Sequence, residues 1–254
     1  MRHPYHLVER SPWPFLISLN LLFFLTGFVS LFSGYKYAEM TYFGSLILVL
    51  MILIFWFNDI MSESIYIGAH SYKVSRGLIL GFLYFGLTEI MLFVSLFWGY
   101  FHSALNPTYL VWPPIGIDLI NPWSVPLLNT FLLLYSGIAC TWAHHSFLSH
   151  SRSNTLFSLG LGIILGLIFV FFQGFEYFNA SYDITDSVYA SAFFLTTGAH
   201  GLHVIMGLTF LIVVWLRVYL HHSPNLIFDL SLLYWHGVDI IWILLFILIY
   251  YLGY

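Results

Sequence analysis

KVSRGLILGFLYFGLTEIMLFVSLFWGYFHSALNP, residues 73–107, is the stretch that decides the fold. This nearly unbroken apolar run starts with basic residues and stops at an Asn-Pro pair, which predicts one long membrane-spanning helix. A single carboxylic acid, Glu89, lies near its middle. At about 1.5 Å per residue, Glu89 lies on the order of 20 Å beyond Arg76, close to the centre of a bilayer.

Glu89 has no titratable neighbour one helical turn away. The residues three and four positions from it are Phe85, Gly86, Leu92 and Phe93. Because an isolated charge in hydrocarbon is costly, we expect Glu89 to be neutral or to have a partner on another helix. Two interpretations follow. The acid either makes one hydrogen bond that holds two helices together, or it exchanges protons or senses a bound lipid.

The composition excludes an ordinary soluble domain. Of the 254 residues, 60% are hydrophobic and only 7% are charged, which is typical of a protein embedded in a bilayer. The single cysteine, Cys140, excludes an internal disulfide and any metal site built on a pair of cysteines. The apolar run after residue 14 lacks the pattern of a cleaved signal, so we expect it to remain as the first span.

Apolar runs of adequate length predict an all-α polytopic membrane protein with seven transmembrane helices. The expected spans are Phe15–Gly34, Tyr42–Phe57, Ser75–Leu105, Val125–Phe147, Thr155–Tyr177, Tyr189–Leu220 and Leu230–Tyr251. The polar residues from Asn58 onward predict an early end for the second span. We expect the chain to divide there, into an amino-terminal segment with two helices (residues 1–72) and a five-helix bundle (residues 73–254).

The basic residues predict the orientation. Six of the seven Lys and Arg residues would lie on the side of the amino terminus, and Lys36 alone on the other; the six are Arg2, Arg10, Lys73, Arg76, Arg152 and Arg217. This bias places the amino terminus in the compartment where the protein is made.

Pairs of polar residues recur three positions apart in the later spans: Gln173 with Glu176, His200 with His203, and His236 with Asp239. Each pair shares one helical face, and the three faces are expected to converge inside the bundle, where Gly198, Gly201 and Gly207 would allow close helix contact. The favoured interpretation is a structural polar network. Ligation of a metal or haem by these histidines, and a role in proton transfer or headgroup binding, are the alternatives.

A second group of residues lies near the ends of the spans on the amino-terminal side. It consists of Trp56, Asp59, Glu63, His70, Lys73, Arg76 and Arg217. Basic groups at headgroup depth suit a lipid phosphate, although ordinary interfacial residues would give the same pattern.

Several long segments of the chain are similar to the family of subunit 3 of cytochrome c oxidase, and together they span nearly its whole length. They are HPYHLVERSPWP (residues 3–14), GLTEIMLFVSLFWGYFHSAL (86–105), WPPIGIDLINPWSVPLLNTFLLLYSGIACTWAHH (112–145), QGFEYFNASYDITDSVYASAFFLTTGAHGLHVIMG (173–207) and YWHGVDIIW (234–242).

The resemblance implies more than the residues alone. It implies two helices and five helices splayed into a V with phospholipids in the cleft, and no metal or redox centre in this chain. It implies packing on subunit 1, which holds the haems and copper, and support of proton uptake and stability there. It places Glu89 on the family's buried carboxylate, and Trp56, Glu63, His70 and Arg217 on positions associated with lipids.

The chain also departs from the pattern of the family. Asn58 and Ser62 stand where arginines are frequent in animal members, and Ala69 stands where a second histidine is frequent. The resemblance implies a mitochondrial inner-membrane protein with its amino terminus toward the matrix, although an aerobic bacterial origin fits the bare sequence nearly as well.

Two hypotheses of different classes therefore follow from the sequence. The first is a non-catalytic core subunit of a proton-pumping oxidase. The second is a stand-alone proton-coupled transporter or channel that uses Glu89, Glu176 and Asp239; the lack of an inverted repeat counts against it. A single-haem cytochrome through His203 and His236 is a third, minor option.

Overall fold

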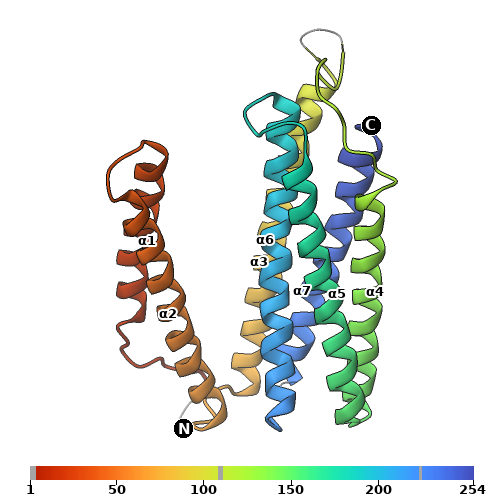
Figure 1. The fold of residues 1–254 in the computed structure, drawn as a ribbon. Helices are drawn as coiled ribbons and strands as arrows, with labels where there is room; N and C mark the ends of the chain where they lie inside the picture. The colour runs from red at the N-terminus through yellow and green to blue at the C-terminus, as the bar shows by residue number, and fades with distance from the viewer. Residues whose placement is uncertain (1–3, 108–110, 223–224) are drawn as a thin grey trace. The chain divides into compact units, whose positions relative to one another are not determined.

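The computed structural model describes residues 4–107, 111–222 and 225–254, and these residues form seven α-helices and no strand (Figure 1). All seven helices are long and apolar enough to cross a membrane, which confirms the predicted all-α polytopic fold. Their bounds are α1 Trp13–Phe32, α2 Ala38–Ile65, α3 Tyr72–Ala104, α4 Val125–Leu148, α5 Arg152–Asn179, α6 Val188–Tyr219 and α7 Asn225–Leu245, which a π-helical turn extends over Phe246–Tyr251. Arg2, which contributes to the orientation argument, lies outside the described residues.

The chain forms two compact units, Met1–Leu80 and Gly81–Tyr254, and each is described by itself. The first unit holds α1, α2 and the start of α3. The second holds the rest of α3 together with α4 to α7. The domain boundary that the sequence suggests after residue 72 stays a prediction.

In the first unit, α2 continues two turns beyond the predicted end at Phe57. It ends at Ile65, so the prediction that the polar residues stop the helix is wrong. Ser62 donates a hydrogen bond from its hydroxyl to the carbonyl of Asn58 at 2.9 Å, which is a bond within the helix. Polar side chains carry only a small intrinsic penalty in a helix, and here they extend α2 beyond its apolar part.

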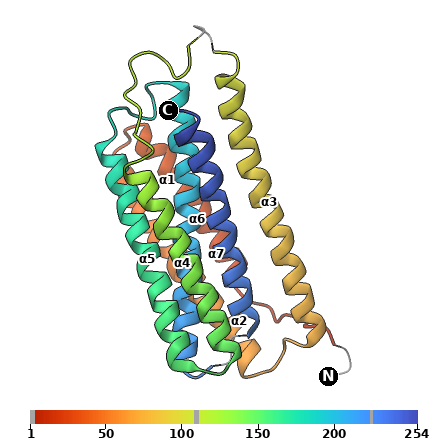
Figure 2. The same cartoon turned by 90° about the vertical axis from the view of Figure 1, so that its right-hand side faces the viewer.

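In the second unit, α4 to α7 run side by side around a core of large aromatic side chains (Figures 1 and 2). Trp235 and Trp242 of α7 are almost fully buried. Trp235 donates from its indole nitrogen to the Ser136 hydroxyl at 2.8 Å, and Trp242 donates to Thr130 at 3.0 Å. Both indole N–H groups are therefore satisfied without water, as a membrane interior requires.

The helix α3 contributes one narrow stripe to this core. Phe93 and Tyr100, seven residues apart, are each 2% exposed, and Phe82, Phe97 and Phe101 pack against the core beside them. Most of the other side chains of α3 are exposed at the surface of the unit. One face of α3 therefore contacts the protein core, and its other faces are suited to contact with lipid.

Of the three glycines of α6 that the sequence marks for close packing, Gly207 alone is tightly enclosed. A Cβ atom added at Gly207 would lie 2.8 Å from Cε3 of Trp235, whereas one added at Gly201 would meet nothing within 4 Å. At Gly198 the nearest atom would be the Tyr177 hydroxyl at 3.9 Å. Gly207 is therefore the position where α6 and α7 approach most closely among these three.

We predict that Gly207→Ala lowers the free energy of unfolding by about 1–3 kcal/mol, the usual cost of overpacking a well-packed core. Trp235 has little freedom to move away, since it is buried and bonded to Ser136. Thermal unfolding followed by circular dichroism in detergent measures the effect. Gly201→Ala is the matched control on the same helix and should keep or raise stability, because alanine is the better helix former. Equal stability of the two variants would contradict the packing described here.

Candidate functional site

Glu89 has a partner on another helix, which is one of the two alternatives that its place in the sequence leaves open. Oε2 of Glu89 on α3 lies 2.5 Å from Nε2 of His203 on α6. The Glu89 side chain is 24% exposed and that of His203 is 12% exposed. The pair therefore lies at the edge of the bundle, enclosed by protein on one side and open on the other.

The hydrogen bond of the second ring nitrogen of His203, Nδ1, determines the protonation of the Glu89–His203 pair. Nδ1 lies 2.6 Å from the backbone carbonyl oxygen of Ala199. Because a carbonyl oxygen only accepts, Nδ1 must carry a proton and donate it. One further proton then lies between Nε2 and Oε2, bonded to either atom. The pair has no net charge in both arrangements, which removes most of the cost of placing it in a bilayer.

Aromatic rings fix the plane of the His203 imidazole. The buried ring of Phe93 meets it edge-on with the centroids 5.3 Å apart, and the ring of Tyr234 lies parallel to it at 6.5 Å. Phe93 stands one turn beyond Glu89 on α3, so the same helix supplies both the acid and a wall of the site.

Glu176 is bound at a separate place in the core. It is 5% exposed, and the Tyr250 hydroxyl donates a hydrogen bond to its Oε1 at 2.5 Å. Gln173, three residues earlier on α5, donates weakly to the same hydroxyl at 3.5 Å. The predicted face of Gln173 and Glu176 thus meets the π-helical turn at the end of α7, a partner that the sequence pattern does not identify.

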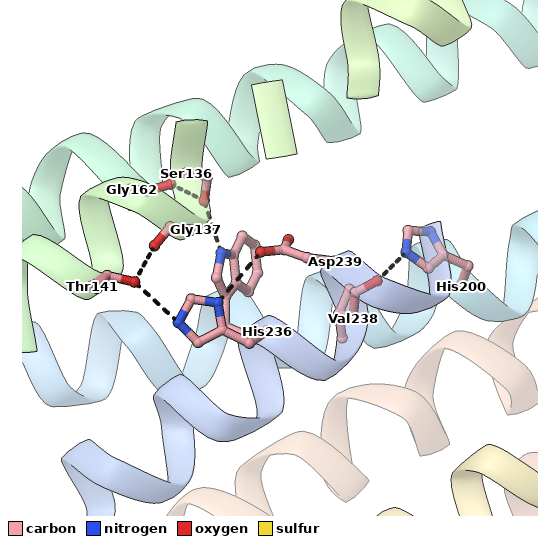
Figure 3. Close-up of polar contacts among 9 residues, drawn as sticks. Ser136, Gly137, Thr141, Gly162, His200, His236, Val238 and Asp239 are labelled. Atoms are coloured by element: carbon pink, nitrogen blue, oxygen red, sulfur yellow. Dashed lines mark hydrogen bonds and ion pairs between the residues drawn. The ribbon is translucent and has the colours of Figure 1, made fainter. Parts of the chain in front are cut away.

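His200, His236 and Asp239 form a third group (Figure 3). His200 is 1% exposed and its Nε2 donates to the carbonyl oxygen of Val238 at 3.3 Å. Oδ2 of Asp239 lies 3.7 Å from Nδ1 of His236, an ion-pair distance rather than a hydrogen bond. The other ring nitrogen of His236 lies 3.4 Å from the Thr141 hydroxyl of α4.

The three predicted polar faces do not converge into one network. Among the described residues, no hydrogen bond joins the side chains of one pair to those of another. His203 turns toward α3, whereas His200, three residues earlier, turns toward α7. The polar residues therefore act as separate links between pairs of helices. In the same part of the chain, no cluster of three or more His, Cys, Asp or Glu side chains could hold a metal ion.

The residues expected to bind lipid belong to both units. In the first unit, the half-buried Trp56 and Glu63 lie on α2, and Glu63 contacts Nε2 of His6 at 2.9 Å. The ring of His6 lies edge-on to that of His70, with the centroids 6.1 Å apart. In the second unit, Arg217 is 8% exposed near the end of α6. The pairing of Glu63 with the amino-terminal segment was not predicted, because that segment has no periodic pattern.

The fold and these links define the class of the protein: a polytopic helical membrane protein whose buried polar side chains pair between helices. The family model described as cytochrome c oxidase subunit III matches residues 3–254. The chain is 44% identical to cytochrome c oxidase subunit 3 of Rhizopus stolonifer, covering 99% of this chain and 91% of that protein. It is 45% identical to cytochrome c oxidase subunit 3 of Pisaster ochraceus, covering 99% of this chain and 98% of that protein.

The chain belongs to the cytochrome c oxidase subunit III family. Membership of this family implies a complex with other oxidase subunits. The resemblance noted in the sequence is thereby confirmed.

We predict that Tyr250→Phe lowers the free energy of unfolding by about 1–3 kcal/mol, because Glu176 loses the donor to Oε1 while it remains buried. Thermal unfolding in detergent measures the change. The double variant Tyr250→Phe with Glu176→Leu should recover part of the loss, since both polar partners are then gone. Tyr251→Phe, at a side chain that is 53% exposed, is the control and should be neutral. An unchanged stability in Tyr250→Phe would show that the contact contributes nothing.

Proposed function

We propose that the chain is a non-catalytic core subunit of a proton-pumping cytochrome c oxidase. In this proposal the chain packs on subunit 1, which holds the haems and copper, and helps to maintain proton uptake and stability there. The observation that carries the proposal is the match to the family over residues 3–254. The relatives from Rhizopus stolonifer and Pisaster ochraceus, both named cytochrome c oxidase subunit 3, support it.

Glu89 is the residue through which the chain would act on protons. It shares one proton with His203, and a quarter of its side chain is open at the surface of the unit. A proton that moves between Oε2 and Nε2 shifts charge within the pair without changing the total. Such a pair holds or passes a proton at low cost in a membrane, and it responds to a polar headgroup or a partner helix placed beside it.

Lipid binding is the second part of the proposal. Arg217 supports it, because its Nε atom is buried and has no hydrogen-bond partner among the described residues. A guanidinium near the end of a transmembrane helix suits a lipid phosphate. In the first unit, taken by itself, Trp56 and His70 would each contact lipid, whereas the Glu63 carboxylate is already bonded to His6. The role of Glu63 would be to hold the amino-terminal segment near the lipid.

The proposed location is the mitochondrial inner membrane, with the amino terminus toward the matrix. The distribution of the seven Lys and Arg residues supports the orientation. The seven helices support a multi-pass protein, and the mitochondrial membrane is inferred from the resemblance of the sequence to the mitochondrial type of the family.

We predict that Glu89→Gln leaves the oxidase assembled but slows proton uptake and shortens the period of sustained turnover. Glutamine has nearly the same shape and donates an amide N–H to Nε2 of His203, so the link between the helices is kept. It cannot release or accept a proton. Proton uptake measured with a pH-sensitive dye during repeated turnovers checks the prediction.

Glu39→Gln is the matched control for that experiment. Glu39 is an exposed acid in the first turn of α2, and its substitution should leave uptake and turnover unchanged. Normal uptake and normal inactivation in Glu89→Gln would contradict a proton-related role. Failure of the chain to purify with any haem-containing partner would contradict the subunit proposal as a whole.

A further inference from the structure

The ends of four helices surround a pocket of about 660 Å³ in the second unit. The helices α4 and α6 finish beside it, and α5 and α7 begin beside it, at the lower end of the bundle in Figure 1. Its polar lining consists of His150, Arg152, Thr155, His221, His222 and Asp229. We call this cavity the histidine pocket. None of its residues belongs to the links described above.

The two helix ends that supply the histidines have the same backbone structure. At the end of α4, the N–H of His150 bonds to the carbonyl of Phe147 and the N–H of Ser151 bonds to that of Ser146. At the end of α6, the N–H groups of His221 and His222 bond to Val218 and Arg217 in the same pattern. Both are Schellman motifs, in which the residue just past the helix adopts a left-handed conformation.

Glycine is the usual residue at that left-handed position, because it has no Cβ. Here histidine occupies it twice, with φ of 58° at His150 and 61° at His221. A side chain at such a position costs stability, and both of these side chains line the same pocket. The occurrence of histidine at both left-handed positions beside one cavity suggests a binding role for the two imidazoles.

Two hydrogen bonds to backbone carbonyls hold the Arg152 side chain at the pocket. Its Nε donates to the carbonyl of Val218 at 3.1 Å, and Nη2 donates to that of Tyr219 at 2.6 Å. Nη1 makes no hydrogen bond within the described residues. A guanidinium fixed by two backbone bonds keeps its remaining donors oriented, so little side-chain entropy is lost when an anion binds.

Among the described lining residues there is one acid, and a residue outside the lining already contacts it. Oδ1 of Asp229 lies 3.2 Å from Nε2 of His144, which is not a lining residue. In addition, Nδ1 of His222 is buried and has no hydrogen-bond partner among the described residues. The pocket therefore has more hydrogen-bond donors than its own acid uses.

We propose that the histidine pocket binds a phosphate group, with Arg152 and the imidazoles of His150, His221 and His222 donating to its oxygens. A phosphate has several oxygens and accepts from donors on different sides at once. The apolar part of the lining, Phe147, Leu148 and Val218, suits the glycerol and first acyl carbons of a phospholipid. The ends of transmembrane helices lie at headgroup depth, so a lipid is the natural source of the phosphate.

The test measures binding of short-chain phosphatidic acid to the full chain in detergent, together with any subunits that copurify. Isothermal titration calorimetry gives the dissociation constant. The double variant His150→Gly with His221→Gly should bind roughly a hundredfold more weakly, about tenfold for each of the two charge-assisted hydrogen bonds that are lost. His222→Gln should also weaken binding, and His102→Gln, on α3 and outside the pocket, should not.

Thermal unfolding of the same variants separates binding from folding. The double glycine variant should be as stable as the parent or more so, because glycine is favoured at both left-handed positions. Weaker binding with unimpaired stability supports the proposal. Unchanged binding in this variant, or loss of binding only where stability also falls, would overturn it.

Two further probes identify the source of the phosphate. Inorganic phosphate that competes with phosphatidic acid supports a site for the phosphate group alone, whereas a lack of competition supports a lipid that also needs the apolar wall. Diacylglycerol of the same chain length has no phosphate. Binding of diacylglycerol as tight as that of phosphatidic acid would overturn the proposal. The outcome is independent of the oxidase proposal, because every lining residue belongs to this chain.

Discussion

The hydrogen bond between Glu89 and His203 is the interaction on which the placement of α3 in the second unit depends. Most of the surface of α3 is apolar and exposed, and apolar surface gains little from leaving lipid for protein. A hydrogen bond between polar side chains determines the position of α3 more strongly than apolar contacts do, because an unpaired carboxyl group in hydrocarbon is costly. The carbonyl of Ala199 fixes the proton on Nδ1 of His203, and the one further proton shared between Nε2 and Oε2 leaves the pair with no net charge.

The same constraint explains three other buried hydrogen bonds. Trp235 bonds to Ser136, Trp242 to Thr130 and Tyr250 to Glu176, each from one helix to another. Close approach at Gly207 brings the ring of Trp235 against α6. Packing and hydrogen bonding are thus coupled, since the indole that fills the space at Gly207 is the one that Ser136 holds. This arrangement forms a scaffold without a cluster of metal ligands in the described residues.

Much of the fold could be predicted from the sequence, because apolar runs of bilayer length have few alternatives. The need of Glu89 for a partner was also predictable from its depth. The identity of the partner was not, since the spacing of His200 and His203 shows only that they lie near one helical face. The structure turns one toward α7 and the other toward α3. The two extra turns of α2 and the pairing of His6 with Glu63 lie in polar segments of the chain, which give no periodic hydrophobic signal.

Infrared difference spectroscopy of the Glu89 carboxyl group tests the central claim most directly. The band of Glu89 is assigned as the one that Glu89→Gln removes, and its position is then measured in His203→Phe. The account predicts a clear shift, because the variant removes the nitrogen with which Oε2 shares its proton, while His102→Phe leaves the band in place. An identical band in His203→Phe and the parent protein would contradict the account.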